Sequence, residues 1–455
     1  MPQNNQTHKN IMKLWDKGFD TSEFVTRFTV GRDREMDLYL AEYDALGCMA
    51  HAQMLSECGL LGKDDNDKLQ QELRKIHAIA VDGKFEIAPD VEDVHSQIEF
   101  MLTERLGDPG KRIHTARSRN DQVVTAVRLF TRAKLQKIIE TVKGVFETFV
   151  ELSEKYKDIL LPGYTHLQIA MPSSFGLWFG CYAESLADDL QTLLSAWKIN
   201  NRNPLGSAAG YGSSFPIDRQ RTSDLLGFDS PDYNSVYAQM TRGKVETVVA
   251  SALAQLSQTL AKFAADCCLF MSQNFKFISL PKEYTTGSSI MPHKANPDVF
   301  ELMRGYCNKI SVLPFELNRI TGNLTCGYFR DLQLLKESYL PVFERMQMCL
   351  DFMEFILPKI QPREDILKNE MYQPIFTVEA LNEMVVAGVP FRDAYKEVGH
   401  QVFEGKFHWD KPLNHTHIGS IGNLCNDKIA ALFNEVYSQF NFEKVDKAVA
   451  KLTKE

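Results

Sequence analysis

Three long stretches of this sequence repeat apolar residues at the spacing of an α-helix, and they limit the possible folds more than any other feature. They cover about residues 123–152, 173–199 and 243–272. Each carries apolar side chains over a wide face, so each needs packing partners on more than one side. Further helices are predicted over about 298–321 and 335–358. Because strand patterns are few, we predict an all-α fold around a long-helix bundle that is buried in an oligomer.

Shorter helical patterns flank the predicted bundle on both sides. Before it, helices are expected over about 33–60, 64–80 and 91–106, separated by glycine-containing breaks. After Pro362 the periodic segments become short again. The predicted domains are a small N-terminal helical domain (1–114), the central long-helix bundle (115–362) and a small C-terminal helical domain (363–455).

Composition sets limits on the class of protein. The 455 residues are 44% hydrophobic and 24% charged, which is ordinary for a globular chain. Lysine and arginine number 51 and aspartate and glutamate 59, so the net charge of -8 argues against a general nucleic-acid binder. No run of 18 apolar residues predicts a membrane span, and residues 1–20 lack the apolar core of a signal peptide.

The nine cysteines are scattered and form no C-x-x-C pattern. Such usage suits buried thiols in a reducing compartment better than a disulfide framework or a zinc site, so we expect a cytoplasmic protein. His415 and His417 are close enough in sequence to suggest a metal site, but no third ligand lies near them. We therefore expect no bound metal.

Residues 285–297 read T-T-G-S-S-I-M-P-H-K-A-N-P and cannot continue a helix, because a glycine frees the backbone and Pro292 lacks an amide donor. We predict an exposed loop, and loops on a rigid scaffold often carry catalytic groups. A serine hydroxyl can act as a base only in a desolvated, cation-rich site that stabilises the alkoxide. The alternative is a surface turn rich in small residues. The candidate residues of the loop are Ser288, Ser289, Lys294 and Asn296.

A second candidate region is residues 161–168, L-P-G-Y-T-H-L-Q. His166 lies beside a hydroxyl, Thr165, in a segment that glycine and proline make a loop. The ordinary pKa of a histidine suits proton transfer near neutral pH. The alternative is a structural histidine with no part in catalysis.

Two further segments are dense in hydrogen-bonding groups. Residues 115–122 read T-A-R-S-R-N-D-Q, in which arginine forks match carboxylates and Asn120 can orient another. Its alternative role is an ordinary helix start. Residues 328–336 read Y-F-R-D-L-Q-L-L-K, and Gln333 and Lys336 lie on one face if this is a helix. An ordinary polar helix start is again the alternative.

These motifs together resemble a known family. The pattern G-S-S-x-M-P-x-K-x-N-P is similar to the signature loop of the fumarase/aspartase superfamily, whose enzymes eliminate fumarate or a close relative from a substituted succinate. The runs T-H-L-Q, S-R-N-D-Q and Y-x-[KR]-D-L-Q-x-x-K resemble the argininosuccinate lyase family in particular. This resemblance implies elimination of L-arginine from argininosuccinate without a cofactor, as in arginine biosynthesis. It also implies a homotetramer whose active sites are shared between subunits.

The resemblance also assigns roles. Ser288 would be the catalytic base and Ser289 an oxyanion contact, while Lys294, Asn296 and Asn120 would stabilise the dianion that forms. His166, supported by Glu301, would help to protonate the leaving nitrogen. The remaining substrate contacts would be Ser118, Arg119 and Thr165, with Tyr328, Gln333 and Lys336 holding the amino-acid end.

The sequence departs from the family pattern in three places. The usual F-x-x-S is missing from the segment 28–43, where Arg32-Asp33-Arg34 follows instead, so no contact is assigned there. Arg242 is followed by Gly243 where an acid is usual, and the signature loop has His293 and Ala295 where glutamine and lysine are common. Two alternatives stay open: another lyase of the superfamily, such as one acting on adenylosuccinate, and a non-catalytic protein like the lens crystallins that resemble these enzymes.

Overall fold

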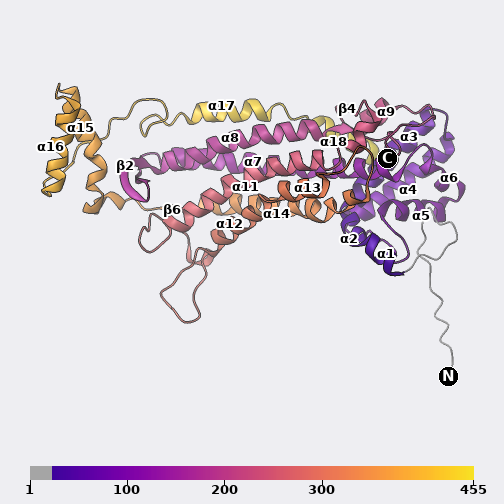
Figure 1. Cartoon of the computed structure of the whole chain (residues 1–455), viewed down its shortest axis with the longest axis horizontal. Helices are drawn as coiled ribbons and strands as arrows, with labels where there is room; N and C mark the ends of the chain where they lie inside the picture. The colour runs from indigo at the N-terminus through magenta and orange to yellow at the C-terminus, as the bar shows by residue number, and fades with distance from the viewer. Residues whose placement is uncertain (1–22, 455) are drawn as a thin grey trace.

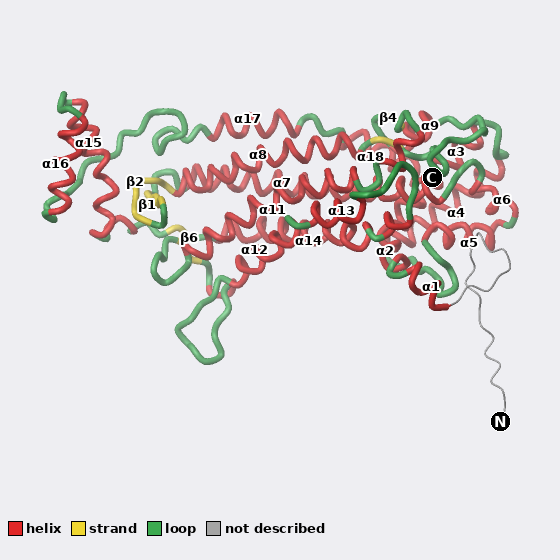
Figure 2. Tube along the Cα trace, in the orientation of Figure 1, coloured by secondary structure: helices red, strands yellow, loops and turns green. Residues whose placement is uncertain are grey.

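The computed structural model describes residues 23–454, and most of its regular structure is helical (Figure 2). Residues 1–22 of the predicted N-terminal domain lie outside the described residues. The molecule is elongated, with the long helices running along its length (Figure 1). The predicted all-α class is confirmed, since the strands are short two-stranded pairs beside the helices.

Four helices make up the body of the bundle. They are α7 (Arg119–Lys155), α8 (Phe175–Asn200), α11 (Lys244–Phe270) and α14 (Leu335–Ile356). Helix α7 packs against α8 and α14, and α11 packs against α8. Their facing side chains form one continuous core, in which Phe130, Phe149 and Phe263 are fully buried. The wide apolar faces seen in the sequence are therefore used, as helical periodicity requires.

Small helices gather at one end of the bundle (Figure 1). These are α1 (Glu23–Val30), α2 (Asp33–Asp37), α3 (Ala41–Glu57), α4 (Lys63–Val81), α5 (Val94–Leu106), α6 (Asp108–Lys111), α9 (Arg219–Leu226) and α10 (Ser235–Met240). The last helix, α18 (Phe442–Thr453), packs here against α9 and α3. The C-terminus therefore returns to the end at which the described chain begins.

The opposite end carries a hairpin, a long loop and a helix pair. Strands β1 (Leu160–Thr165) and β2 (Gln168–Ser174) form an antiparallel hairpin directly after α7. Helices α15 (Thr377–Val386) and α16 (Phe391–Phe403) lie farthest out, and α17 (Asn426–Tyr437) returns along α8. The remaining strands are β3 (Arg202–Asn203) with β4 (Ser230–Pro231), and β5 (Ile278–Ser279) with β6 (Gln361–Pro362).

Two predicted helices are wrong in detail. The helix predicted over 298–321 is two helices, α12 (Asp298–Ile310) and α13 (Leu313–Thr321), because Pro314 lies in the first turn of α13 and starts a new helix there. The helix predicted over 33–60 is α2, a short 3-10 turn and α3. The division into three domains stays a prediction; α17 and α18, both in its C-terminal part, pack on the bundle and on the N-terminal helices.

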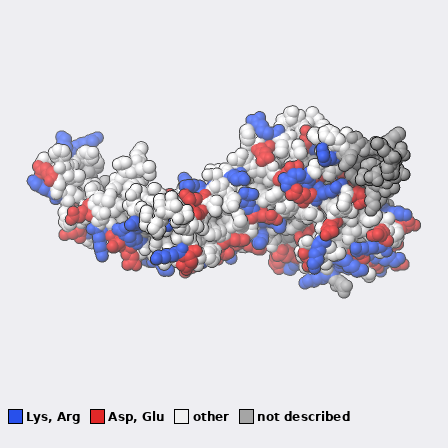
Figure 3. Space-filling view, turned by 90° about the horizontal axis from the view of Figure 1, so that it is seen from below, with Lys and Arg blue, Asp and Glu red and all other residues white. Residues whose placement is uncertain are grey.

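Charge is mixed on the face of the molecule that Figure 3 shows. On the face in Figure 3, acidic and basic side chains are interspersed and no large area carries one sign. Among the described residues no helix is both long and apolar enough to cross a membrane. Within the same residues no group of three or more histidine, cysteine or acidic side chains is arranged to hold a metal ion, and His415 pairs with Glu379 instead.

Candidate active site

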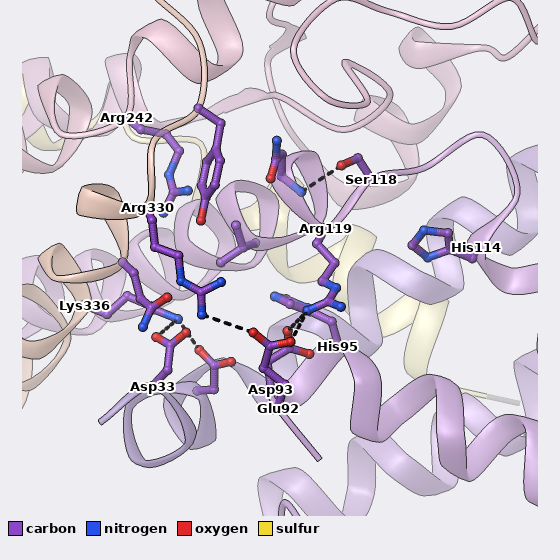
Figure 4. Close-up of a pocket in the computed structure, with 15 residues that line it drawn as sticks. Asp33, Glu92, Asp93, His95, His114, Ser118, Arg119, Arg242, Arg330 and Lys336 are labelled. Atoms are coloured by element: carbon purple, nitrogen blue, oxygen red, sulfur yellow. Dashed lines mark hydrogen bonds and ion pairs between the residues drawn. The ribbon is translucent and has the colours of Figure 1, made fainter. Parts of the chain in front are cut away.

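A polar cavity of about 400 Å³ lies where α7 begins (Figure 4). Its walls come from segments that are far apart in the sequence, and charged side chains dominate them. It is lined by Asp33, Asp37, Glu92, Asp93, His95, His114, Ser118, Arg119, Asn120, Val123, Arg242, Tyr328, Arg330, Gln333 and Lys336. The structure thus brings together the predicted residues of the segments 115–122 and 328–336.

The start of α7 is fixed by a capping box. Ser118 Oγ accepts from the amide of Asn120 at 3.2 Å, and Asp121 Oδ1 accepts from the amide of Ser118 at 2.9 Å. Asp121 Oδ2 also accepts from the amides of Gly206 and Ala208, each at 2.9 Å. Asp121 is completely buried, and this burial raises the pKa of its carboxyl to about 6. These contacts hold the side chains of Arg119 and Asn120 at the cavity wall.

Arg119 forms ion pairs with two acidic side chains of the cavity. Its Nη1 lies 2.7 Å from Asp93 Oδ2 and 3.1 Å from Glu92 Oε2, and Arg330 Nη2 lies 3.1 Å from Glu92 Oε1. Asp93 accepts from the amide of Ser96 as the N-cap of α5, which fixes the carboxylates in place. Glu92 therefore links two arginines from distant segments across the cavity.

Lys336 is buried between two carboxylates. Its Nζ is ion-paired with Asp33 and lies 2.6 Å from Asp37 Oδ1. Burial opposes the charged ammonium, but Asp37 and Asp33 outweigh it and raise the pKa of Lys336. Burial, together with the neighbouring Asp37, raises the pKa of Asp33 in spite of Lys336. The divergent segment 28–43 thus contributes acids to the cavity.

Gln333 and Tyr328 complete this side of the cavity. Gln333 Nε2 donates to the carbonyls of Thr29 and Val30 at 3.0 and 3.2 Å, so the end of α1 is tied to the segment 328–336. The Arg242 guanidinium lies 5.5 Å from the centre of the Tyr328 ring, within the range of a cation–π contact. Arg242 is therefore part of the cavity wall.

Gly243 has a structural reason to be glycine. Its φ is +82°, and a Cβ there would lie 2.4 Å from Thr321 Cγ2. Its amide instead donates to Glu246 Oε2 at 2.7 Å, which caps α11. The departure from the family pattern at this position therefore follows from the close approach of α13 and a left-handed backbone.

The pKa values of two histidines of the cavity are shifted in opposite directions. His95 Nδ1 lies 3.0 Å from Asp44 Oδ1 in a buried site; burial lowers the pKa of His95, but Asp44 and Asp93 outweigh it and raise it overall. His114 has its pKa lowered to about 4, first by burial and then by Arg117 and Arg119. The surroundings thus favour the charged form of His95 and disfavour the charged form of His114.

The signature loop lies elsewhere and projects from the body just before α12 (Figure 2). Its neck is closed by a backbone pair, in which the amide of Asn296 donates to the carbonyl of Thr286 at 2.8 Å. Asn296 Nδ2 donates to Gly287 O at 3.3 Å, and Thr286 Oγ1 donates to Asp298. The lobe beyond this neck holds Ser288, Ser289 and Lys294.

Inside the lobe, Ser288 Oγ accepts from the amides of Ile290 and Met291 at 3.4 and 3.1 Å. Ser289 and Lys294 are exposed, and so is Ile290 at the tip, at 83%.

His166 lies at the tip of the β1–β2 hairpin. Thr165 pairs with Gln168, so the turn consists of His166 and Leu167, with φ values of +54° and +57°. Two positive φ values are the pattern of a type I′ turn. Thr165 and His166 are both exposed. The predicted loop is therefore a tight hairpin turn that presents His166 to solvent.

The two groups of predicted residues lie at opposite ends of long helices. Helix α7 has 37 residues, so it spans roughly 55 Å between the cavity and the hairpin. Helix α11 has 27 residues and separates Arg242 from the signature loop by roughly 40 Å. Within the described chain no hydrogen bond or ion pair joins His166 to Glu301, which is exposed on α12. The proposed roles of all these residues stay predictions.

Sequence reasoning missed the acids of the cavity: Asp33, Asp37, Glu92 and Asp93. Asp33 and Lys336 are about 300 residues apart in sequence, so no local pattern could pair them. One signal was present, since Asp93 directly precedes a helix and can cap it. That signal indicates a cap but not a place in the cavity.

Comparisons with known proteins identify the family of this chain. A family model described as a lyase matches residues 20–311. The chain is 57% identical to an argininosuccinate lyase of Parabacteroides distasonis, over 97% of this chain and 99% of the relative. It is 38% identical to an argininosuccinate lyase of Thermotoga neapolitana, over 85% of this chain and 97% of the relative.

Solved structures show the same fold at lower identity. An EDDS lyase variant with bound fumarate matches with a TM-score of 0.71 and 21% identity, over 96% of this chain and 94% of that one. A class II fumarase of Schistosoma mansoni matches with a TM-score of 0.71 and 16% identity, over 91% and 95%. These likenesses extend the helical fold to fumarate-related enzymes. The chain belongs to the argininosuccinate lyase family of the fumarase/aspartase superfamily.

Proposed function

We propose that this chain eliminates L-arginine from N-(L-arginino)succinate and releases fumarate, a step of arginine biosynthesis. The proposal is supported by the family and by a cavity that combines the segments 115–122 and 328–336. It involves proton removal beside a carboxylate and departure of a nitrogen, so the residues of the chain suffice and no cofactor takes part.

A site shared between subunits follows from the separation of the proposed site residues along α7 and α11. A base on the 285–297 loop and a cavity roughly 40 Å away cannot act on one substrate within one chain. We therefore propose a homotetramer in which the cavity of one subunit is completed by the hairpin and the signature loop of others. The exposed apolar side chains Leu302, Val312 and Phe315 on α12 and around α13 are suited to be covered in such an assembly.

In the proposed mechanism Ser288 removes the proton next to a succinyl carboxylate. Lys294, Asn296 and Asn120 stabilise the doubly negative intermediate, because fixed donors and a cation are aimed where charge develops. His166, supported by Glu301, protonates the guanidinium nitrogen as it leaves. Closure of the signature loop excludes water and completes the site.

The remaining contacts hold the two ends of the substrate. Ser118, Arg119, Thr165 and Ser289 bind the succinyl part, and Tyr328, Gln333 and Lys336 hold the amino-acid end. Arg119 is paired with Asp93 and Glu92, so substrate carboxylates compete with these acids for it. We also propose a cytoplasmic location, since all nine cysteines are free thiols.

The test of the activity is fumarate absorbance when purified protein meets argininosuccinate, with adenylosuccinate as the parallel sample. We expect fumarate from argininosuccinate alone. Fumarate from adenylosuccinate alone would keep the loop chemistry and overturn the specificity given to residues 328–336. A folded tetramer that releases fumarate from neither would favour a non-catalytic protein.

The test of the shared site uses two chains that are inactive for different reasons. Asn120→Ala removes a cavity contact and Ser288→Ala removes the base, and each variant refolded alone is expected to be inactive. When the two are refolded together in equal amounts, about a quarter of the sites receive an intact residue from each, since chains of a symmetric oligomer mix at random. A mixture as inactive as its parents would contradict sharing between subunits.

A further inference from the structure

The buried ion cluster at Lys336 is not neutral. Two carboxylates, Asp33 and Asp37, flank one ammonium, so one negative charge is left over in this corner of the cavity. A buried excess charge is costly unless a partner compensates it. The raised pKa of Asp33 has the same origin, because burial and Asp37 outweigh the attraction of Lys336. The corner is therefore suited to receive a cation.

The two acids are not equivalent. Asp37 is almost completely buried, with a side chain 1% exposed, and its Oδ2 also accepts from the amide of Val94 at 3.2 Å. The side chain of Asp33 is 12% exposed and, among residues 23–454, Lys336 is its one hydrogen-bonding or ion-pair partner. Asp33 therefore keeps acceptor capacity toward the cavity, and Asp37 serves as the structural partner of Lys336.

The place of Asp33 indicates which cation it would meet. It lies against Lys336, and Gln333 and Tyr328 line the same cavity. These are the residues to which the proposed function gives the amino-acid end of the substrate. Figure 4 shows Asp33 beside Lys336 on one side of the cavity, away from Ser118 on the other. The substrate carries an α-ammonium at its amino-acid end, so charge and position agree.

We propose that Asp33 determines specificity by binding the α-ammonium of the departing arginine. The ammonium donates to the free carboxylate oxygen of Asp33, so that this carboxylate gains a second cationic partner beside Lys336. Asp33 comes from the segment that lacks the family's usual serine, so this chain uses a carboxylate at this wall of the cavity. This inference rests on the proposed function and adds a residue to it.

Removing the charge of Asp33 is compatible with folding. In Asp33→Asn the ammonium of Lys336 keeps Asp37 as its partner, so no buried charge is left alone. Asp33→Ser is a second variant of smaller volume. The control is Glu35→Gln in the same segment, where an exposed acid pairs with exposed Arg32. Thermal unfolding of all four proteins checks that the fold is retained.

The test measures inhibition constants against argininosuccinate for three compounds. L-Arginine has both an α-ammonium and a carboxylate, 5-guanidinopentanoate lacks the ammonium, and agmatine lacks the carboxylate. If Asp33 makes a charge-assisted hydrogen bond to the ammonium, Asp33→Asn raises the inhibition constants of L-arginine and agmatine by about 10- to 100-fold. Inhibition by 5-guanidinopentanoate should be unchanged, and Glu35→Gln should bind all three as the wild type does.

The outcomes separate this inference from the proposed function. A wild type that releases no fumarate from argininosuccinate would overturn the proposed function itself. The inference would be overturned if the wild type is active and the Asp33 variants bind all three inhibitors more weakly by the same factor. Asp33 would then only shape the cavity. Unchanged binding of L-arginine in a folded Asp33→Asn variant would overturn it as well.

Discussion

The predicted site residues at the two ends of the bundle differ in burial and in their contacts. At the cavity end, Arg119, Lys336 and Arg242 are largely buried, and their positions are fixed by carboxylates, backbone caps and an aromatic ring. At the loop end, His166 and Lys294 are exposed, and their contacts are confined to their own hairpin or loop. The folding of one chain fixes the residues at the cavity end of the proposed site, but it leaves those at the loop end exposed.

This difference predicts which substitutions should change both stability and activity and which should change activity alone. A buried, paired group contributes to folding and to binding at once, so its removal affects both. An exposed catalytic group has few neighbours to lose, so its removal affects turnover alone. Substitutions of the same kind at the two ends can therefore test whether stability and turnover respond differently.

The largest effect is expected at the loop end, in turnover. Ser288→Ala should lower kcat by about 1,000-fold or more, because the chain then lacks its proposed base. The proposed tetramer should persist, since among the described residues the hydroxyl hydrogen-bonds to amides of its own loop. Steady-state kinetics and light scattering measure the two properties. Ser289→Ala is the matched control with a smaller loss, and near wild-type activity of Ser288→Ala would end the role given to it.

The second prediction compares one substitution at both ends. Lys336→Met leaves Asp33 and Asp37 buried without their cation, so we expect the free energy of unfolding to fall by about 3–5 kcal/mol. Lys294→Met on the exposed loop should change it by about 0.5 kcal/mol or less. Urea unfolding of each variant measures the difference. Equal stability of the two variants would remove the distinction between the ends.

The third prediction concerns pH at the cavity end. His51 is fully buried, its Nε2 lies 2.8 Å from the carbonyl of Thr115, and burial lowers its pKa to about 3. The unfolded chain then binds a proton at His51 that the folded chain does not, so the contribution of His51 to stability falls as pH drops from about 6.5 toward 3. At pH 5 this contribution is about 2 kcal/mol lower than at pH 7.5.

Urea unfolding across this pH range tests the prediction. His51→Gln should flatten the dependence, while Lys294→Met at the loop end should leave it in place. His114, whose pKa is about 4, contributes in the same direction and over part of the same range. A profile of His51→Gln that is as steep as the wild type would assign the acid sensitivity to other groups.

The smallest effect is expected at the neck of the signature loop. Thr286→Val removes the hydroxyl that donates to Asp298 and accepts from Asn296, so the lobe should sample more conformations. We expect kcat to fall about 5-fold, which corresponds to about 1 kcal/mol in the activation free energy, with stability unchanged. Thr286→Ser should restore turnover, and no recovery would point to packing of the methyl group instead.

The fold was predictable where a pattern was local. The spacing of Val123, Phe130 and Phe149 indicated α7, and the three long helices begin and end within a few residues of the prediction. The break before α13 was missed because its apolar residues keep helical spacing through Pro314. The hairpin was missed because its turn lacks the asparagine and glycine that usually mark one.

The candidate site was predictable only in part. Motifs identified Ser118, Tyr328 and Lys336, and the cavity contains all three. Sequence could not place Asp33, because its pairing with Lys336 depends on how α2 packs against α14. It also could not show that His166 and Asn120 lie at opposite ends of one helix, since a motif carries no distance.

The hairpin tip has a consequence for engineering. His166 and Leu167 hold backbone angles that asparagine and glycine adopt at lower cost. A search for thermostable variants should therefore select replacements at both positions, and His166 would be the first residue lost. The chain keeps a poor turn former where a better one is available, and the role proposed for His166 accounts for this as a trade of stability for activity. A library selected first for heat resistance and then for turnover would show that trade directly.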